Sequence, residues 1–330
     1  MSSLHLMDAS TIQDRLARDP RRVLEIVKSA YKAHWERRTV CPNSLFLRFP
    51  HGERIIALPA YINDDTLSAA GIKWISSFPD NIAKNLPRAS AVIVLNDLST
   101  GYPTAVMEGA AISAARTAAF AALAFDKLLE IKDNLRIAVV GCGRIALTTL
   151  SYLSLLGIFA ELRVFDLSSE RAQQFLAQQA LLVPKARTAS SLADALQGAD
   201  VALFATTSST PYVKDEALLK DCRLILHVSL RDIDAKVLGS CVNVTDDREH
   251  VLRENTSLHR LAVSNPDREA VDADLGDVIW GTAVIPDDRV IAFSPFGLGV
   301  LDVALASSVL HDAARDGGTT QINRFFHSEN

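Results

Sequence analysis

A glycine-containing turn between two strand-like runs most restricts the fold of this chain. The apolar run 135–140 leads into Gly141-Cys142-Gly143-Arg144-Ile145-Ala146, and a helical pattern follows through Leu155. A second strand-like run, 161–165, stops at Asp166. In such a turn the first glycine permits the bend, the second lets a pyrophosphate approach the backbone, and the alanine lets helix and strand pack closely. The sequence therefore predicts a βαβ unit that binds a dinucleotide at the N-terminus of the new helix. The predicted cofactor contacts here are Gly141, Gly143, Arg144 and Ile145.

The second strand ends in a carboxylate that favours one cofactor. Asp166 lies 166 − 141 = 25 residues after Gly141, near the roughly 20 expected for a side chain that binds the adenosine ribose. Its charge would repel a 2′-phosphate, so we expect NAD rather than NADP. Arg171 leaves an alternative open, because it could reach such a phosphate or be a solvated surface charge. The structural alternative is a buried βαβ unit with a small-residue turn and no nucleotide.

Composition limits the other classes of function. With 330 residues, 48% of them hydrophobic, the chain is long enough for two domains with a large core. A net charge of −5 gives no basic footprint for nucleic acid. The four cysteines lack paired spacing, which fits a reduced cytoplasmic protein, and neither they nor the eight scattered histidines predict a metal site. The sequence shows no signal peptide and no apolar stretch of membrane-spanning length, so we expect a small-molecule partner and no membrane.

The nucleotide unit begins only at residue 135, so another region precedes it. A start signal at Asp8 and helical spacing from Val23 to Tyr31 predict an N-terminal helix. Strand-like runs then predict a mostly antiparallel sheet, and an alanine-rich stretch predicts a long helix at Val106–Leu129. These runs are Ser44–Phe49, Arg54–Leu58, Ala69–Ile75 and Ala91–Asn96. Beyond Asp166 the predicted helices are 169–182 and 190–197, and the predicted strands are 201–205, 224–228 and 242–244.

Polar side chains cluster where the later strands end. In doubly wound sheets, ligands bind outside the carboxyl ends of the strands. We therefore expect this edge to meet cofactor and substrate, with Asp232 placed as an acid–base group. The polar residues at these ends are Thr206, Thr207, Ser208, Ser229 and Asp232.

Two cations in the preceding region are poorly explained by solvation. Lys73 lies in an otherwise apolar strand, where it either reaches the edge or points inward for a functional reason. Arg116 is the only charge between Glu108 and Asp126, and a bidentate clamp on a carboxylate or phosphate explains it best. Arg48, near a turn, could be merely a surface charge.

At this point the sequence resembles a known family along almost its full length, the ornithine cyclodeaminase/μ-crystallin family. The motifs that carry the resemblance are Gly71-Ile72-Lys73-Trp74, Leu95-Asn96-Asp97 through Gly101-Tyr102-Pro103, Ala105-Val106-Met107-Glu108-Gly109, Ala115-Arg116-Thr117-Ala118-Ala119, the glycine turn, and Gly297-Leu298-Gly299-Val300-Leu301-Asp302. The resemblance implies an α/β fold in which a Rossmann-type doubly wound sheet, residues 118–304, is inserted into an α+β substrate and dimerisation domain, residues 1–117 plus 305–330. It also implies a homodimer.

The resemblance implies roles for individual residues. Arg48, Lys73 and Arg116 match positions that hold the substrate carboxylate, and Asp232 matches the acid–base aspartate. Lys73 could share that acid–base work. The matched cofactor contacts are Thr117, Gly297 and Leu298, in addition to the glycine turn and the polar strand ends.

Two departures argue against ornithine as the substrate. Cyclodeaminases carry a glutamate where this chain has Ile56, and Gly-Gly-Asp where it has Leu230-Arg231-Asp232. Arg231 adds a positive charge suited to a substrate with more than one carboxylate, or it pairs with Asp232 or Asp234 at the surface.

The motifs around Lys73 and Asn96 are most similar to one branch, the N-(2-amino-2-carboxyethyl)-L-glutamate dehydrogenases of 2,3-diaminopropionate biosynthesis. For this branch we expect NAD-dependent oxidative C–N cleavage of N-(1-amino-1-carboxyethyl)-glutamate, in which the diaminopropionate β-nitrogen is joined to the α-carbon of glutamate. The products would be 2,3-diaminopropionate, 2-oxoglutarate and NADH, for siderophore or antibiotic biosynthesis. The alternatives are an ornithine or lysine cyclodeaminase, a ketimine reductase or alanine dehydrogenase, and a non-enzymatic crystallin-like NAD(P)-binding protein.

Overall fold

The computed structural model describes residues 3–179, 182–286 and 288–326. The chain divides into two compact units, residues 1–116 with 298–330, and residues 117–297. The predicted boundaries after 117 and 304 differ from these divisions by 117 − 116 = 1 and 304 − 297 = 7 residues. The second difference arises because the C-terminal helix α11 (Gly299–Arg315) packs entirely within the first unit. The functions expected of the two domains stay predictions.

The first unit is built on a mostly antiparallel sheet. The strand order is β16-β1-β7-β6-β5-β4-β2, with β3 paired to β4. Among the described strands of this first sheet, only β1 and β7 pair in parallel. The strands are β1 (Leu4–Met7), β2 (Thr39–Val40), β3 (Leu45–Arg48), β4 (Arg54–Asn63), β5 (Ser68–Ser77), β6 (Ala89–Asn96), β7 (Pro103–Glu108) and β16 (Thr320–Ile322).

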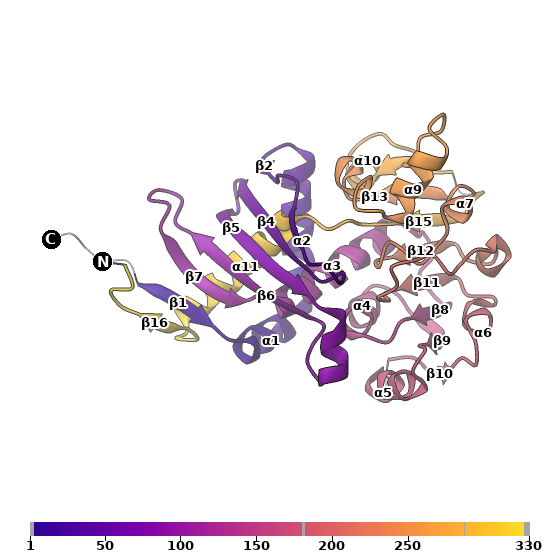
Figure 1. The fold of residues 1–330 in the computed structure, drawn as a ribbon, viewed down its shortest axis with the longest axis horizontal. Coiled ribbons are helices and arrows are strands. Elements are labelled where there is room, and N and C mark those ends of the chain that lie inside the picture. The colour runs from indigo at the N-terminus through magenta and orange to yellow at the C-terminus, as the bar shows by residue number, and fades with distance from the viewer. Residues whose placement is uncertain (1–2, 180–181, 287, 327–330) are drawn as a thin grey trace. The chain divides into compact units, whose positions relative to one another are not determined.

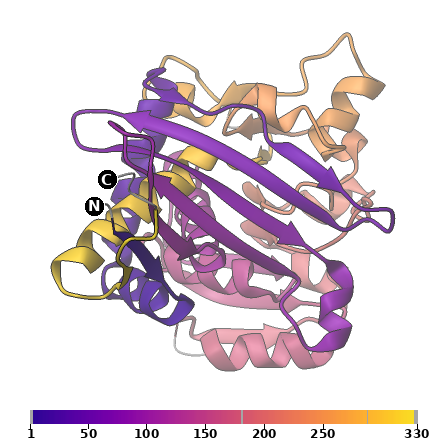
Figure 2. The same ribbon diagram turned by 60° about the vertical axis from the view of Figure 1, so that its left-hand side comes forward.

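Helices cover one face of this sheet. α11 contacts β4, β5 and β6 and packs against α2, and Figures 1 and 2 show it, in yellow, crossing the strands. One row of neighbours on the covered face is Leu58, Lys73, Ile93 and Met107, and all four are buried. The other helical segments of this unit are α1 (Ala9–Arg18), α2 (Pro20–Trp35) and η1 (Pro79–Lys84), while α3 (Ala110–Leu128) begins in this unit and continues into the second.

The opposite face of the sheet carries exposed apolar side chains. Successive strand residues point to opposite faces, so the row Leu45, Ala57, Trp74 and Val92 lies away from the helices. Leu45 is 70% exposed, Trp74 42% and Val92 40%. We call this surface the open face, defined by Leu45, Leu47, Tyr61, Trp74 and Val92.

The second unit is a parallel sheet with the order β10-β9-β8-β11-β12-β15-β13-β14. Its strands are β8 (Leu135–Val140), β9 (Phe159–Phe165), β10 (Lys185–Thr188), β11 (Val201–Phe204), β12 (Leu224–His227), β13 (Val242–Thr245), β14 (Ala273–Asp274) and β15 (Ile291–Phe293). The helical connections are α4 (Arg144–Leu153), α5 (Ser169–Gln179), α6 (Leu192–Leu196), η2 (Glu216–Leu219), α7 (Ala235–Leu238), α8 (Arg248–Val251), α9 (Ser257–Ser264) and α10 (Leu275–Ile279).

The order of this sheet fixes where a ligand binds. The chain moves outward from β8 to β9 and β10 on one side, and returns to β11 and β12 on the other, so the topology switches between β8 and β11. Ligands of open α/β sheets bind at such a switch, beyond the carboxyl ends of the strands. The predicted fold class, a Rossmann-type doubly wound sheet inserted into an α+β domain, is confirmed.

Three helix predictions extend beyond the helices observed, and the shortest of them, 190–197, corresponds to α6 at Leu192–Leu196. The predicted helix Val106–Leu129 begins too early, because Val106 and Met107 pair with β6 as part of β7. Gly109 follows the end of β7. A Cβ on this residue would lie 3.0 Å from the Cβ of Ala91, so any residue other than glycine here would require Ala91 to move. The predicted helix 169–182 ends at Gln179; residues 180 and 181 lie outside the described residues, and Leu182 is in a turn. In the part of the chain that is described, no helix is long and apolar enough to cross a membrane.

Candidate functional site

The glycine turn has the geometry needed to receive an anion. Gly141 follows β8 with φ +89°, and a Cβ placed on it would lie 2.7 Å from the carbonyl oxygen of Ala205. Gly143 is the N-cap residue of α4 and supplies no side-chain cap, and a Cβ on it would meet nothing within 4 Å. The open space beside Gly143, together with the uncapped first turn at the positive end of the α4 helix dipole, suits a pyrophosphate. Arg144 is exposed and Ile145 half-buried at the same turn.

Asp166 lies against this turn, at the end of β9. Its Oδ2 accepts a hydrogen bond of 2.9 Å from the backbone N–H of Cys142, and its Oδ1 accepts one of 2.9 Å from the N–H of Ser168. The carboxylate is thus fixed beside the loop by two backbone donors. Arg171, the alternative partner for a 2′-phosphate, lies in α5 and is exposed.

Asp232 is the centre of a buried polar cluster in the second unit. Its carboxylate accepts hydrogen bonds from the hydroxyls of Thr206 and Ser229, and one of 2.9 Å from that of Tyr212. Burial on its own would raise the pKa of Asp232, but hydrogen bonds from its neighbours, above all His227, outweigh burial and hold that pKa at about 2. The side chain is therefore an ionised carboxylate at neutral pH and able to act as a base.

His227 is a partner of Asp232 that was not predicted from the sequence. Its Nε2 lies 3.3 Å from Oδ2 of Asp232 and 3.2 Å from the backbone nitrogen of that residue, and its Nδ1 lies 3.2 Å from the hydroxyl of Ser294. With a proton on Nε2 the ring donates to the carboxylate, and in the other tautomer it accepts from the amide. Its position as the last residue of β12, at the ligand edge of the sheet, is the signal that could have identified it.

The loop before Asp232 is strained at a residue where glycine is favoured. Leu230 has φ +69°, in the left-handed region that costs a non-glycine residue about 1–2 kcal/mol. Its side chain is 8% exposed, and its carbonyl accepts from the N–H of Ser257. Arg231 is half-buried and donates at 2.6 Å to the carbonyl of Glu254. These contacts fix the loop that presents Asp232.

The first unit holds a separate cluster of buried charges on the covered face of its sheet. Nζ of Lys73 lies 2.5 Å from Oδ2 of Asp302 and 3.2 Å from the hydroxyl of Ser113. Nε of Arg116 lies 3.1 Å from Oδ1 of the same carboxylate. Lys73 is 2% exposed, Arg116 8% and Asp302 0%. The inward placement of Lys73, which the sequence left open, is thereby settled.

This cluster combines two cations with one anion. Burial, helped by the positive charge of Arg116, lowers the pKa of Lys73 to about 8, although Asp302 acts in the opposite direction. With Lys73 protonated, the three side chains carry a net charge of +1 away from bulk water, where charge interactions are strong. Such a site attracts a single carboxylate. Asp302 belongs to a sequence motif, but its role is not predictable from that motif, because nothing local to α11 indicates that two cations lie opposite it.

Other predicted contacts are spread over both units. Arg48 is exposed on β3, and its guanidinium lies 4.7 Å from the centre of the Phe46 ring. None of the contacts described here joins Arg48 to the Lys73 cluster. Thr117 is half-buried on α3, and Thr207 is exposed after β11. The Ser208 amide donates to the Thr206 hydroxyl at 3.1 Å.

The C-terminal motif is held by a buried acid. Asp246 accepts hydrogen bonds of 2.8 Å from the N–H of Phe296 and 2.6 Å from that of Gly297, which has φ +96°. Burial raises the pKa of Asp246. Leu298 is fully buried and is the N-cap residue of α11. The sequence did not identify Asp246 as the residue that fixes this turn.

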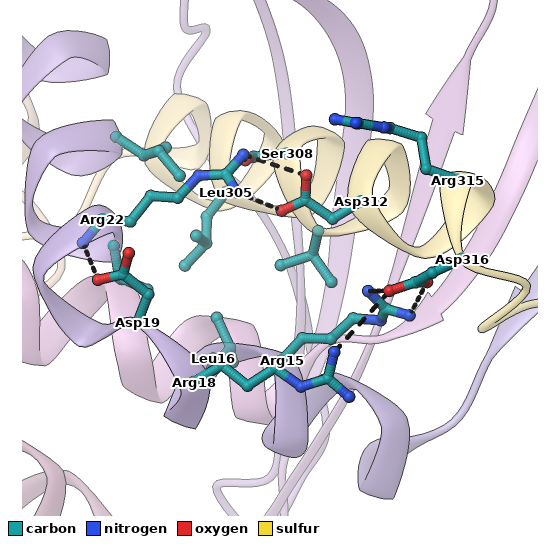
Figure 3. A pocket seen from close by; sticks show the side chains of 13 residues that line it. Arg15, Leu16, Arg18, Asp19, Arg22, Leu305, Ser308, Asp312, Arg315 and Asp316 are labelled. Atoms are coloured by element: carbon teal, nitrogen blue, oxygen red, sulfur yellow. Dashed lines mark hydrogen bonds and ion pairs between the residues drawn. The ribbon is translucent and has the colours of Figure 1, made fainter.

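A cavity of about 410 Å³ lies among α1, α2 and α11 in the first unit, away from the predicted site residues (Figure 3). Three of the arginines that line it are paired with aspartates: Arg22 lies 2.7 Å from Asp312, and Arg15 and Arg18 both pair with Asp316. The charges at its rim therefore largely neutralise one another.

Comparison with known proteins identifies the family. Residues 23–318 match the family model described as the ornithine cyclodeaminase/mu-crystallin family. The chain belongs to this family. It is 31% identical over 283 residues to N-((2S)-2-amino-2-carboxyethyl)-L-glutamate dehydrogenase of Staphylococcus aureus, covering 83% of each chain. It is 27% identical over 316 residues to alanine dehydrogenase of Archaeoglobus fulgidus, covering 92% of this chain and 93% of that one.

Solved structures agree with this assignment. Delta(1)-pyrroline-2-carboxylate reductase of Thermococcus litoralis, in complex with NADH and L-proline, aligns with a TM-score of 0.88 at 26% identity, over 96% of this chain and 100% of that one. An archaeal alanine dehydrogenase dimer with bound NAD aligns with a TM-score of 0.87 at 25% identity, over 98% of this chain and 100% of that one. The family contains NAD(P)-dependent dehydrogenases and reductases, so the predicted class, an oxidoreductase that uses NAD and acts on a C–N bond, is confirmed at the level of the family.

Proposed function

We propose that this protein is an NAD-dependent dehydrogenase that cleaves the secondary amine of N-(2-amino-2-carboxyethyl)-L-glutamate. The observation that carries the proposal is the buried Lys73–Arg116 pair, held by one aspartate so that a net positive charge remains for an amino acid carboxylate. The similarity to the Staphylococcus aureus enzyme supports the substrate. A glutamate joined through the diaminopropionate β-nitrogen carries a 2-amino-2-carboxyethyl group. The substrate is therefore N-(2-amino-2-carboxyethyl)-L-glutamate and not N-(1-amino-1-carboxyethyl)-glutamate.

The described residues fit NAD as the cofactor. The open space at Gly143 and the uncapped N-terminus of α4 would receive the pyrophosphate, and Asp166 would bind the adenosine ribose. NAD supplies a hydride acceptor when bound. Further contacts that we propose for it come from Arg144, Ile145, Thr117, Thr206, Thr207, Ser208, Ser229, Gly297 and Leu298.

The reaction follows from the charges that the chain provides. Lys73 and Arg116 bind the carboxylate on the carbon that is oxidised, and Arg48 and Arg231 add charge for the substrate's other carboxylates. The Cα–H of the glutamate moiety leaves as hydride, the nitrogen loses a proton, and a C=N bond forms. Fixing the reacting carbon in this way can supply on the order of 7–11 kcal/mol of barrier reduction in ideal cases.

Asp232 then performs the hydrolysis. Its ionised carboxylate removes a proton from a water molecule, whose oxygen adds to the imine carbon. The protonated Asp232 returns the proton to the nitrogen as the C–N bond breaks. The balance is substrate, NAD⁺ and water in, and 2-oxoglutarate, 2,3-diaminopropionate, NADH and a proton out.

We propose further that the protein acts as a cytoplasmic homodimer joined through the open face. One row there crosses the four neighbouring strands β3, β4, β5 and β6, and it contains the exposed residues Leu45, Trp74 and Val92. A hollow of about 380 Å³ that includes Tyr61 and Ile72 lies on the same sheet. Contiguous exposed apolar surface of this kind marks interaction sites. The archaeal alanine dehydrogenase is a dimer.

The test is incubation of the purified protein with NAD⁺ and N-(2-amino-2-carboxyethyl)-L-glutamate, in parallel with ornithine and with alanine. Steady NADH formation with 2-oxoglutarate in the first reaction only is the expected result. Ammonia and proline from ornithine without net NADH would instead mean a cyclodeaminase. NADH formed from alanine, or NADH consumed with a cyclic imine, would mean an alanine dehydrogenase or a ketimine reductase. Binding of NADH without turnover of any of them would mean a binding protein.

A further inference from the structure

Lys73 could in principle be a base or a carboxylate-binding cation, and its surroundings decide between these roles. Nζ has two described hydrogen-bond partners, the carboxylate of Asp302 and the hydroxyl of Ser113. The first is an acceptor only, and the second can accept. A neutral amine would give up the attraction to Asp302 that an ammonium ion retains.

Asp302 also holds the second cation. Its two carboxylate oxygens are divided, with Oδ2 toward Lys73 and Oδ1 toward Arg116. A single side chain on α11 therefore fixes one cation from β5 and another from α3. Asp302 is fully buried, so its charge is not screened by water and both contacts are strong.

We infer that Asp302 is a positioning residue that keeps Lys73 as an ammonium ion for carboxylate binding, which leaves the acid–base work to Asp232. The inference rests on the proposed function and goes beyond it, because it removes Lys73 from the proton transfers. Two oxygens of one carboxylate hold the two cations at a fixed separation. That geometry prepares both to meet the two oxygens of a substrate carboxylate without prior rearrangement.

The charges around Lys73 explain why Asp302 is needed. Arg116, from α3, lowers the pKa of Lys73, whereas Asp302, from α11, and Cys41, from the segment before β3, act to raise it. Asp302 is the only one of these that touches Nζ with a full negative charge. Without it, burial and Arg116 together favour the neutral amine.

The test measures Lys73 directly. The full-length protein is prepared with lysine carrying ¹³C at Cε, and the Lys73 signal, assigned with Lys73→Arg, is titrated by NMR. In the wild type we expect a midpoint near 8. In Asp302→Asn the midpoint should fall by about one pH unit or more. Asp312→Asn removes the same charge from the surface of the same helix, where it pairs with Arg22, and should leave the midpoint unchanged.

Kinetics and binding complete the test. Asp302→Asn should raise KM for the amino acid by about tenfold or more, with a smaller change in kcat and unchanged NADH affinity. If that variant does not fold, Asp302→Glu, which keeps the charge, should fold and keep the Lys73 midpoint near the wild-type value. An unchanged or raised midpoint in folded Asp302→Asn overturns the inference. The titration needs no substrate, so a protein that leaves the proposed amino acid untouched, yet shows the expected midpoints, refutes the proposed function alone.

Discussion

The two glycines of the nucleotide turn should respond to alanine in opposite ways. Gly141 has φ +89° and its Cβ position lies 2.7 Å from the Ala205 carbonyl oxygen and 2.9 Å from the carbon of the same group. Gly143 has φ −90°, and its Cβ position has no neighbour within 4 Å. Gly141→Ala therefore tests the stability of the turn, and Gly143→Ala tests whether the turn binds the cofactor pyrophosphate.

The magnitudes follow from this geometry. An alanine at the φ of Gly141 costs about 1–2 kcal/mol, and the forced shift of backbone at Ala205 adds about 1–3 kcal/mol. In a unit of this size each kcal/mol lowers Tm by roughly 2–4 °C, so we expect a fall on the order of 10 °C. Gly143→Ala restricts the unfolded chain, which stabilises the fold by about 0.4–1 kcal/mol, but alanine is less favourable than glycine at the N-cap of α4, so Tm should stay close to that of the wild type.

The assay is thermal unfolding of both variants without cofactor, followed by NADH titration monitored by fluorescence. Gly143→Ala should keep its Tm and bind NADH at least about tenfold more weakly, since the methyl group occupies the space that the pyrophosphate needs. A Gly141→Ala protein as stable as the wild type would refute the reasoning about the turn. Undiminished NADH affinity in Gly143→Ala would refute the assignment of the pyrophosphate site.

Other predictions concern single charges and the open face. Asp232→Asn should abolish turnover while retaining NADH affinity; substantial kcat would exclude Asp232 as the base. Because the folded pKa of Asp232 is held at about 2, below the unfolded value of about 4, its stabilising contribution is present above pH 4 and is lost as the pH falls toward 2. Denaturant unfolding across that range should therefore show a smaller loss in Asp232→Asn than in the wild type. Asp166→Asn keeps an acceptor for the Cys142 amide but removes the charge, so the ratio of NADPH to NADH affinity should rise, and an unchanged ratio counts against the ribose assignment. Trp74→Glu on the open face should give a monomer by light scattering, whereas a persistent dimer would place the interface elsewhere.

The sequence predicted the nucleotide unit well because its signals are local. The glycine turn, the apolar strands and Asp166 lie within one stretch of chain, and each has a short-range physical requirement. The alanine-rich stretch misled because helix propensity favours alanine regardless of context. Val106 and Met107 instead pair with β6, a non-local contact that propensity does not report.

The site was predictable only in part, for the same reason. Lys73 and Arg116 stand out as charges in apolar surroundings, so a local pattern indicates them. Asp302 is separated from Lys73 by 229 positions along the chain, and their contact depends on α11 lying across β5. Asp246 is likewise defined by a distant partner, the backbone of Gly297, 51 positions further along the chain. His227 meets Asp232 only because the loop after β12 turns back toward the end of that strand.

The late position of α11 has a consequence for synthesis on the ribosome. The second unit, residues 117–297, uses no segment from beyond residue 297, whereas the first unit is incomplete until α11 and β16 are made. During that interval Lys73 and Arg116 have no Asp302, and the covered face of the sheet lacks its central helix. A chain that ends before residue 298 would therefore expose an unfinished sheet to chaperones, and the residue that holds both carboxylate-binding cations is among the last parts of the site to be synthesised.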